Sequence, residues 1–194
     1  MWRRFLRFVQ RWLWKPITIL RGILVLAAAL LLRGLVQAEW YLRSDSREFE
    51  TTSPDANLTA ALGSHVRHLS EFIGFRSGAE QYDALESAAR YVRTQLLATG
   101  LPLREQTFDV DGRLFRNFEV TAGRNRNGRL IIVTAHYDSD RHTPGADDNA
   151  SGVAALIELA KRFASRPLPM PVRFVAVSTE EEPYFHTSDM GSYQ

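Results

Sequence analysis

"RLIIVTA", residues 129–135, is a continuous apolar run of the length of one β-strand. Such a run without polar alternation is typical of a central strand that is covered on both faces. "VRFVAVS", residues 172–178, has the same character, and the residues 150–164 between the two runs repeat apolar side chains at helical spacing. The order strand, helix, strand predicts a βαβ unit in a mostly parallel sheet.

The segments upstream of this unit add further elements to the predicted fold. Apolar spacing predicts amphipathic helices over residues 58–73 and 82–98, with Asn57 as the N-cap of the first. Strands are expected at residues 104–109 and 115–121. We therefore predict an α/β fold, a three-layer sandwich in which helices flank a mostly parallel central sheet.

Acidic side chains follow both buried strands. The segment 136–148, "HYDSDRHTPGADD", comes after the first strand, and Glu180, Glu181 and Glu182 come after the second. Ligands of open α/β sheets collect beyond the carboxyl ends of the strands, so we expect both segments at one edge of the sheet.

The concentration of carboxylates around His136 indicates a cation site. A bound divalent ion would offset the repulsion among the carboxylates. This interpretation assumes that no lysine or arginine side chain neutralises their negative charge. A donor set of His, Asp and Glu suits Zn²⁺ and tolerates Mn²⁺ or Co²⁺. His136 and Asp138 lie two residues apart in an extended chain and face the same way, so Asp138 can orient the imidazole.

Two plainer interpretations of the acidic segments stay open at this point. "DDNASG", residues 147–152, can cap a helix, and the three glutamates can form a solvated loop. In the metal interpretation, an aspartate before a helix can bridge two ions, and paired glutamates can divide their roles. One of the pair ligates metal while its neighbour accepts a proton from water.

Three motifs resemble the metal-site motifs of the co-catalytic zinc exopeptidases: "AHYDS" (135–139), "PGADDNASG" (144–152) and "FVAVSTEEEPYFHTSDMGS" (174–192). The resemblance implies two zinc ions, with His136 as a ligand, Asp138 as its orienting partner and Asp148 as the bridging ligand. It also implies a cis peptide bond after Asp148, Glu180 as general base and Glu181 as a zinc ligand. Glu181 and Glu182 are the alternative pair.

The resemblance further implies a zinc-dependent peptidase, an aminopeptidase that uses metal-activated water on peptides with a free N-terminus. Two alternatives are a non-catalytic, membrane-anchored interaction module of the same fold and a glutaminyl cyclase-like zinc acyltransferase. In the family, an aspartate and a histidine ligand follow further downstream, and the sequence ends at Gln194 before either. We expect a sheet that is incomplete at the C-terminus, an unpaired side on strand 172–178 and little or no peptidase activity from these residues.

The N-terminal residues 1–38 contain seven basic residues and no acidic residue. Their uninterrupted apolar run, 22–32, is shorter than the roughly 20 residues that span a bilayer. The stretch 16–38 is long enough if Arg21 and Arg33 extend toward the interfaces. We expect a transmembrane signal anchor, or a signal peptide that is cleaved after Ala38, and either places the following residues on the extracytoplasmic side.

The remaining sequence divides into a polar linker, residues 39–56, and the N-terminal portion of a metallopeptidase domain, residues 57–194. After residue 38 the chain has 17 basic against 22 acidic residues, so no nucleic-acid partner is expected. The chain has no cysteine, which excludes disulfides, cysteine zinc sites and thiol catalysis.

Overall fold

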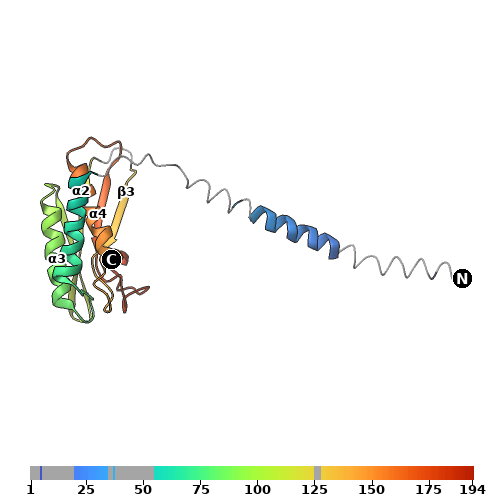
Figure 1. The fold of residues 1–194 in the computed structure, drawn as a ribbon, viewed down its shortest axis with the longest axis horizontal. Coiled ribbons are helices and arrows are strands. Elements are labelled where there is room, and N and C mark those ends of the chain that lie inside the picture. The colour runs from blue at the N-terminus through green and yellow to red at the C-terminus, as the bar shows by residue number, and fades with distance from the viewer. Residues whose placement is uncertain (1–4, 6–19, 35–36, 38–54, 125–127) are drawn as a thin grey trace. The chain divides into compact units, whose positions relative to one another are not determined.

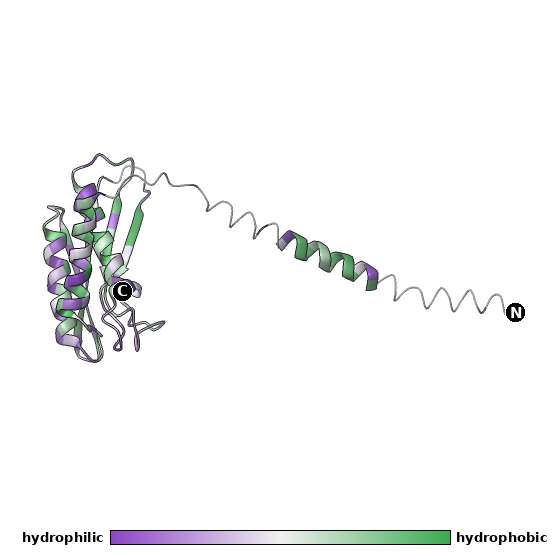
Figure 2. Cartoon of the chain, in the orientation of Figure 1, coloured by the Kyte–Doolittle hydropathy of each residue, from purple (hydrophilic) through white to green (hydrophobic). Residues whose placement is uncertain are grey.

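The computed structural model describes residues 5, 20–34, 37, 55–124 and 128–194, which fall into two units, 1–52 and 53–194. In the first unit, residues 20–34 are helical, exposed and mostly hydrophobic (Figure 2). Among the described residues, no helix combines the length and the apolar character that crossing a membrane requires. Most of the segment 1–38 and of the linker 39–56 lies outside the described residues, so the membrane helix stays a prediction.

The second unit contains every helix and strand that the sequence predicts, with small shifts at the ends. Its first helix begins at Ala56, and Asp55, not Asn57, is the N-cap, because the Asp55 carboxylate accepts hydrogen bonds from the backbone N–H groups of Asn57 and Leu58. The elements are α2 (Ala56–Arg67), η1 (His68–Ile73), α3 (Tyr82–Leu97), β1 (Leu103–Val110), β2 (Arg113–Ala122), β3 (Ile131–His136), η2 (Ala146–Ser151), α4 (Gly152–Ala164), β4 (Val172–Val177) and η3 (Gly191–Tyr193).

The sheet has the strand order β1-β2-β4-β3 and is mixed, so the prediction of a mostly parallel sheet is wrong. β3 and β4 pair in parallel around the α4 crossover, as predicted, but β1 with β2 and β2 with β4 pair antiparallel. The cause is a short turn at Asp111 and Gly112, both with positive φ, which folds β1 and β2 into a hairpin.

The places of the two apolar strands also differ from the prediction. β4 is the inner strand, with neighbours on both sides, and β3 lies at the edge. The unpaired side expected on strand 172–178 therefore belongs to β3 instead.

The helices α2, α3 and α4 of the second unit lie on one face of this sheet (Figure 1). α4 contacts β2, β3 and β4, α3 contacts β2, and α2 packs on α4. The core between them includes Phe118, Val120, Phe174 and Ala176, all fully buried. The opposite face is open in the described residues, where Ile132 on β3 is 60% exposed. The described fold thus has two layers, not the predicted three.

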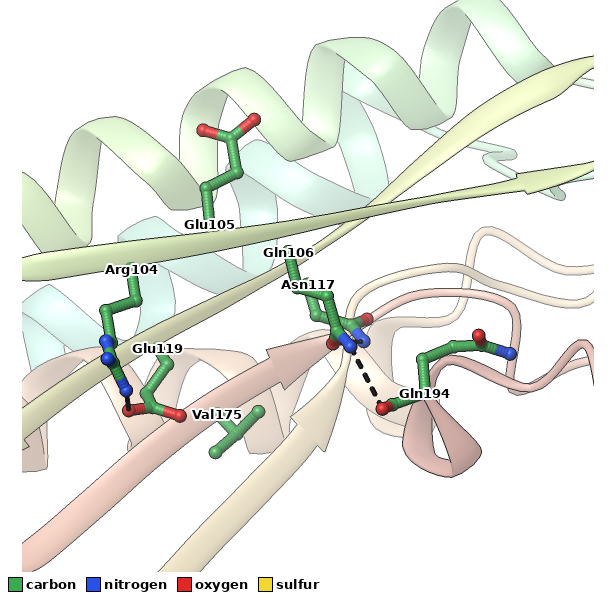
Figure 3. A pocket seen from close by; sticks show the side chains of 7 residues that line it. All are labelled: Arg104, Glu105, Gln106, Asn117, Glu119, Val175 and Gln194. Carbon is green, nitrogen blue, oxygen red and sulfur yellow. Dashed lines mark hydrogen bonds and ion pairs between the residues drawn. The ribbon is translucent and has the colours of Figure 1, made fainter.

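A shallow pocket on the open face is lined mainly by polar side chains (Figure 3). Gln106 on β1 donates a hydrogen bond to the backbone oxygen of Gln194, 2.9 Å away, so the end of the chain lies against this face. Glu105 points the other way, toward the helices. The pocket is formed by Arg104, Glu105, Gln106, Asn117, Glu119, Val175 and Gln194.

Candidate metal centre

The parallel pair of β3 and β4 brings the two acidic segments to one edge of the sheet. His136, the last residue of β3, is paired with Val177, the last residue of β4, so the segments 137–148 and 178–182 leave the sheet side by side. The expectation that both segments lie at the same edge is confirmed.

The imidazole of His136 lies at the centre of the acidic side chains. Its Nε2 atom is 3.0 Å from Asp148 Oδ1 and 3.7 Å from Glu180 Oε2. One ligand atom from each of His136, Glu180 and Glu181 fits within 4.8 Å of the others. Asp148 reaches the imidazole but is not part of this group of three, and its side chain is 74% exposed. These four side chains therefore face one small volume.

Asp138 links the two segments that carry the candidate ligands. Its carboxylate is buried, and Oδ1 lies 3.3 Å from His136 Nδ1, on the side of the ring away from Asp148. Its Oδ2 accepts hydrogen bonds from the backbone N–H groups of Glu180, at 2.8 Å, and Glu181, at 3.0 Å. The sequence suggested only the contact with histidine. The second contact fixes the position of the glutamates as well.

The positions of the three glutamates distinguish the pair Glu180 and Glu181 from the alternative pair Glu181 and Glu182. Glu180 and Glu181 are half-buried and belong to the group around His136, whereas Glu182 is exposed and outside it. The structure therefore favours the pair Glu180 and Glu181. Both of their carboxylates lie near the imidazole, so the assignment of Glu180 as base and Glu181 as ligand stays a prediction.

The carboxylates at the centre lie close enough to one another to shift the pKa values of their neighbours. Burial raises the pKa of Glu180 and of Glu181, and the carboxylates of Asp138 and Asp148 raise it further, against the opposing effect of His136. Burial lowers the pKa of His136, but the surrounding carboxylates, with Asp138 foremost, outweigh it and leave the pKa raised. The acids are thus held where a positive partner would stabilise them.

The turn before α4 presents Asp148 to the histidine. Gly145 adopts a left-handed conformation with φ 56°, and the Asp148–Asn149 peptide bond is cis, as the resemblance implied. Asn149 Oδ1 accepts a hydrogen bond from the N–H of Gly152, at 3.1 Å. The helix-capping interpretation of "DDNASG" is therefore correct for Asn149 and is compatible with a separate role for Asp148.

Two residues that sequence reasoning missed support the centre from outside the motifs. Asn117 on β2 accepts a hydrogen bond from the N–H of Ser178 and donates one to the carbonyl of Gly191, which fixes the segment after β4. Arg76, after η1, is fully buried and holds the loop that follows β3. The supposition that no basic side chain compensates the acids is wrong, because the Arg76 charge interacts with Asp138, Glu181 and Asp148.

The residues present fit a zinc ion. The imidazole Nε2 and several carboxylate oxygens supply the nitrogen and oxygen donors that zinc accepts. His136 Nδ1 and Asp138 Oδ1 are buried and have no hydrogen-bond partner among the described residues, so their contact is electrostatic. That contact leaves Nε2 as the ring atom that faces the acids.

Comparison with known proteins connects this geometry to a family. Residues 118–192 match the model of peptidase family M28. Over 135 residues the chain is 37% identical to the uncharacterized protein YfbL of Escherichia coli, covering 66% of this chain and 41% of that protein. Over 52 residues it is 44% identical to aminopeptidase YwaD of Bacillus subtilis, covering 27% of this chain and 11% of that protein.

Solved structures share the fold. A zinc aminopeptidase from Bacillus subtilis aligns with a TM-score of 0.53 and 15% identity, over 62% of this chain and 61% of that one. A glutaminyl cyclase from Porphyromonas gingivalis aligns with a TM-score of 0.52 and 23% identity, over 69% of this chain and 48% of that one. The chain spans less than half the length of the curated relatives it matches, YfbL and YwaD. Residues 118–192 thus match peptidase family M28, and the motifs that meet at the edge of the sheet are similar to those of the co-catalytic zinc exopeptidases.

Proposed function

We propose that the residues at this edge of the sheet form part of the active site of a zinc-dependent aminopeptidase. Such an enzyme hydrolyses the peptide bond after the N-terminal residue of a peptide. The observation that carries the proposal is the convergence of His136, Glu180 and Glu181 within 4.8 Å, with Asp148 at 3.0 Å from the same imidazole. The family name and the aminopeptidase name of the Bacillus relative support the choice of substrate.

Each side chain has a role that its position allows. His136 through Nε2, Asp148 and Glu181 would hold zinc, with Asp148 as the bridge between two ions. Zinc in such a site polarises a carbonyl and lowers the pKa of water. Glu180 accepts the proton of the attacking water and passes it to the leaving amine, a transfer for which a raised carboxyl pKa is suitable. Asp138 keeps the imidazole and the backbone of both glutamates in place.

Two rival functions lead to different observations. A glutaminyl cyclase would release ammonia from peptides with N-terminal glutamine, and its support is the shared fold alone. A non-catalytic interaction module would not need zinc, yet this chain keeps His136, Asp148 and Glu181 around one small volume. Peptidase activity is favoured because a family model and a relative with sequence identity both carry that name.

The place of action proposed here is the extracytoplasmic side of a membrane. The proposal depends on the seven basic residues and the apolar run within residues 1–38. Cell fractionation with a reporter fused after Gln194 tests it, and a reporter that is active only in the cytoplasm would contradict it.

Glutamine substitutions at the three glutamates test the assigned roles. In zinc titrations of the purified chain, Glu181→Gln should lower the affinity by more than the about 10- to 100-fold that loss of a ligand's hydrogen-bonded partner costs, whereas Glu180→Gln should leave it nearly unchanged. Glu182→Gln is the matched control, since its side chain lies outside the group. Any hydrolysis of aminoacyl amides should be lost in Glu180→Gln and kept in Glu182→Gln.

Two results would contradict the proposal. One is a wild-type chain that binds no zinc, and the other is an equal loss of zinc affinity in Glu181→Gln and Glu182→Gln. Release of ammonia from glutaminyl peptides without cleavage of other aminoacyl amides would support the cyclase instead.

A further inference from the structure

Arg76 is fully buried at the base of the candidate metal centre. It follows η1 in the sequence and belongs to none of the three motifs. A buried arginine normally pairs with a carboxylate, because an unpaired buried charge is costly. Among the described residues, however, the polar atoms within hydrogen-bond distance of Arg76 are backbone carbonyls and one serine hydroxyl.

The guanidinium group reaches both ends of one loop. Its Nε donates to the carbonyl of Tyr137 at 2.7 Å, and its Nη2 donates to the carbonyl of Gly145 at 3.1 Å. Nη1 donates to the carbonyl of Pro144, and the Arg76 backbone N–H donates to Ser139 Oγ at 3.1 Å. The remaining bonds of Nη1 go to the carbonyls of Leu69, within η1, and of Gly74, directly after it, so the guanidinium group also contacts this helical turn.

The loop 137–145 connects the candidate ligands to one another. His136 and Asp138 stand at its start, and Asp148 follows its end. The Gly145 carbonyl that Arg76 holds also accepts the N–H of Ala150 at 3.1 Å, which closes the turn around Asp148. The planar fork of arginine, with several donors in fixed directions, suits this arrangement of carbonyls, and a lysine ammonium cannot match it.

The charge of Arg76 is balanced from a distance. Burial lowers its pKa to about 10, and the carboxylates of Asp138, Glu181 and Asp148 oppose that shift. The acids of the centre thus stabilise the buried guanidinium, and it in turn reduces the repulsion among them. It occupies none of the donor atoms that face the imidazole Nε2.

We propose that Arg76 is a positioning residue of the zinc site, whose guanidinium fork holds the loop 137–145 and so sets the distance from His136 to Asp148. As far as it concerns zinc, the proposal rests on the proposed function. Its effect on the loop does not depend on metal.

Zinc titrations of the 194-residue chain provide the first test. Arg76→Met, which removes the fork and the charge, should lower zinc affinity about 10- to 100-fold, and Arg76→Lys, which keeps the charge, should lower it less. The matched control is Arg113→Met, because Arg113 also donates to two carbonyls, of Gly78 and Ala79, without contacting the loop. It should leave zinc affinity unchanged.

Hydrogen exchange of the metal-free chain provides the second test. In both Arg76 variants, the N–H groups of Ala150, Glu180 and Glu181 should exchange faster, while the paired N–H groups of β1 and β2 should not. A general loss of stability would instead speed exchange in both regions.

The two measurements separate the possible failures. Unchanged zinc affinity in folded Arg76→Lys and Arg76→Met, or unchanged exchange at the loop, would overturn the positioning role. If Arg76→Met does not fold, Arg76→Lys decides by the same criteria. A wild-type chain that binds no zinc contradicts the proposed function, and the exchange data then decide the role of Arg76 alone.

Discussion

At the scale of single residues, Gly145 is the position where one added methyl group should damage the centre. A Cβ atom there would lie 2.2 Å from the backbone oxygen of Asp148 and 2.9 Å from Ser139 Cβ. Gly145→Ala must therefore shift the turn that presents Asp148, beyond the cost of about 1–2 kcal/mol for a left-handed alanine. We expect a clear loss of zinc affinity in titrations and a lower free energy of unfolding in urea.

The control for this prediction is Gly112→Ala in the β1–β2 turn. Gly112 also has positive φ, but a Cβ atom there would meet nothing within 4 Å. The Gly112→Ala variant should have a lower free energy of unfolding, because alanine is strained at positive φ, but its zinc affinity should be unchanged. Equal zinc affinities in the two variants would mean that the turn at Gly145 does not position Asp148.

The candidate ligands could be predicted from the sequence because residue type and the position after a buried strand define them locally. His136 and the glutamates follow closely on an apolar run whose end is visible in the sequence, whereas Asp148 lies farther along and its role came from the resemblance to the family motif. Arg76 and Asn117 could not be found in this way. Their partners are backbone groups of segments far away in the chain, and such contacts leave no local pattern.

At the scale of helices and strands, His65 joins three helices and should make their packing depend on pH. On α2, it lies 2.6 Å from the Tyr91 hydroxyl of α3 and 3.0 Å from the Glu158 carboxylate of α4. Burial lowers its pKa, and Lys161 and His68 act in the same direction, against Glu158. Because the folded state disfavours the charged imidazole, the unfolded state takes up the proton first as pH falls.

The sign of the expected pH effect follows from that lowered pKa. The contribution of His65 to stability is present above the unfolded pKa of 6.5 and is lost as pH falls below that value and through the lowered pKa of the folded state. Urea unfolding from pH 8 to pH 5 should therefore show a steeper loss of stability in the wild type than in His65→Gln. The comparison at each pH cancels the contribution of His136, whose pKa shift is opposite. Parallel pH profiles of the two proteins would refute the prediction.

The positions of the helices and strands were predictable because periodicity depends on near neighbours. The direction of the strands was predicted less well, although the sequence held a signal for it. Asp111 and Gly112 form the kind of dipeptide turn that joins antiparallel strands, and they stand between two predicted strands. The apolar βαβ unit predicts the parallel pairing of β3 with β4, whereas this turn predicts the antiparallel pairing of β1 with β2.

At the scale of the whole described fold, the apolar character of β3 predicts that both of its faces are buried against other segments. Within residues 55–124 and 128–194, only the face toward the helices is buried. Ile132 on the open face is 60% exposed, whereas Ala135, whose partner on β4 is the core residue Ala176, is buried. A sequence shows that a strand is suited to burial. It does not show which segment covers the strand, because that depends on contacts between distant parts of a chain.

The exposed edge strand should make this chain self-associate. β3 has an unpaired side in the described fold and a hydrophobic surface (Figure 2), and such edges pair with other chains unless a charge blocks them. Ile132→Lys should therefore reduce concentration-dependent association in sedimentation velocity experiments and leave the free energy of unfolding nearly unchanged. Leu97→Lys on α3 is the matched control, since Leu97 is a similarly exposed apolar residue, at 45%, away from the edge. A wild-type chain that stays monomeric at every concentration, or an equal effect of both lysines, would show that the edge of β3 does not drive association.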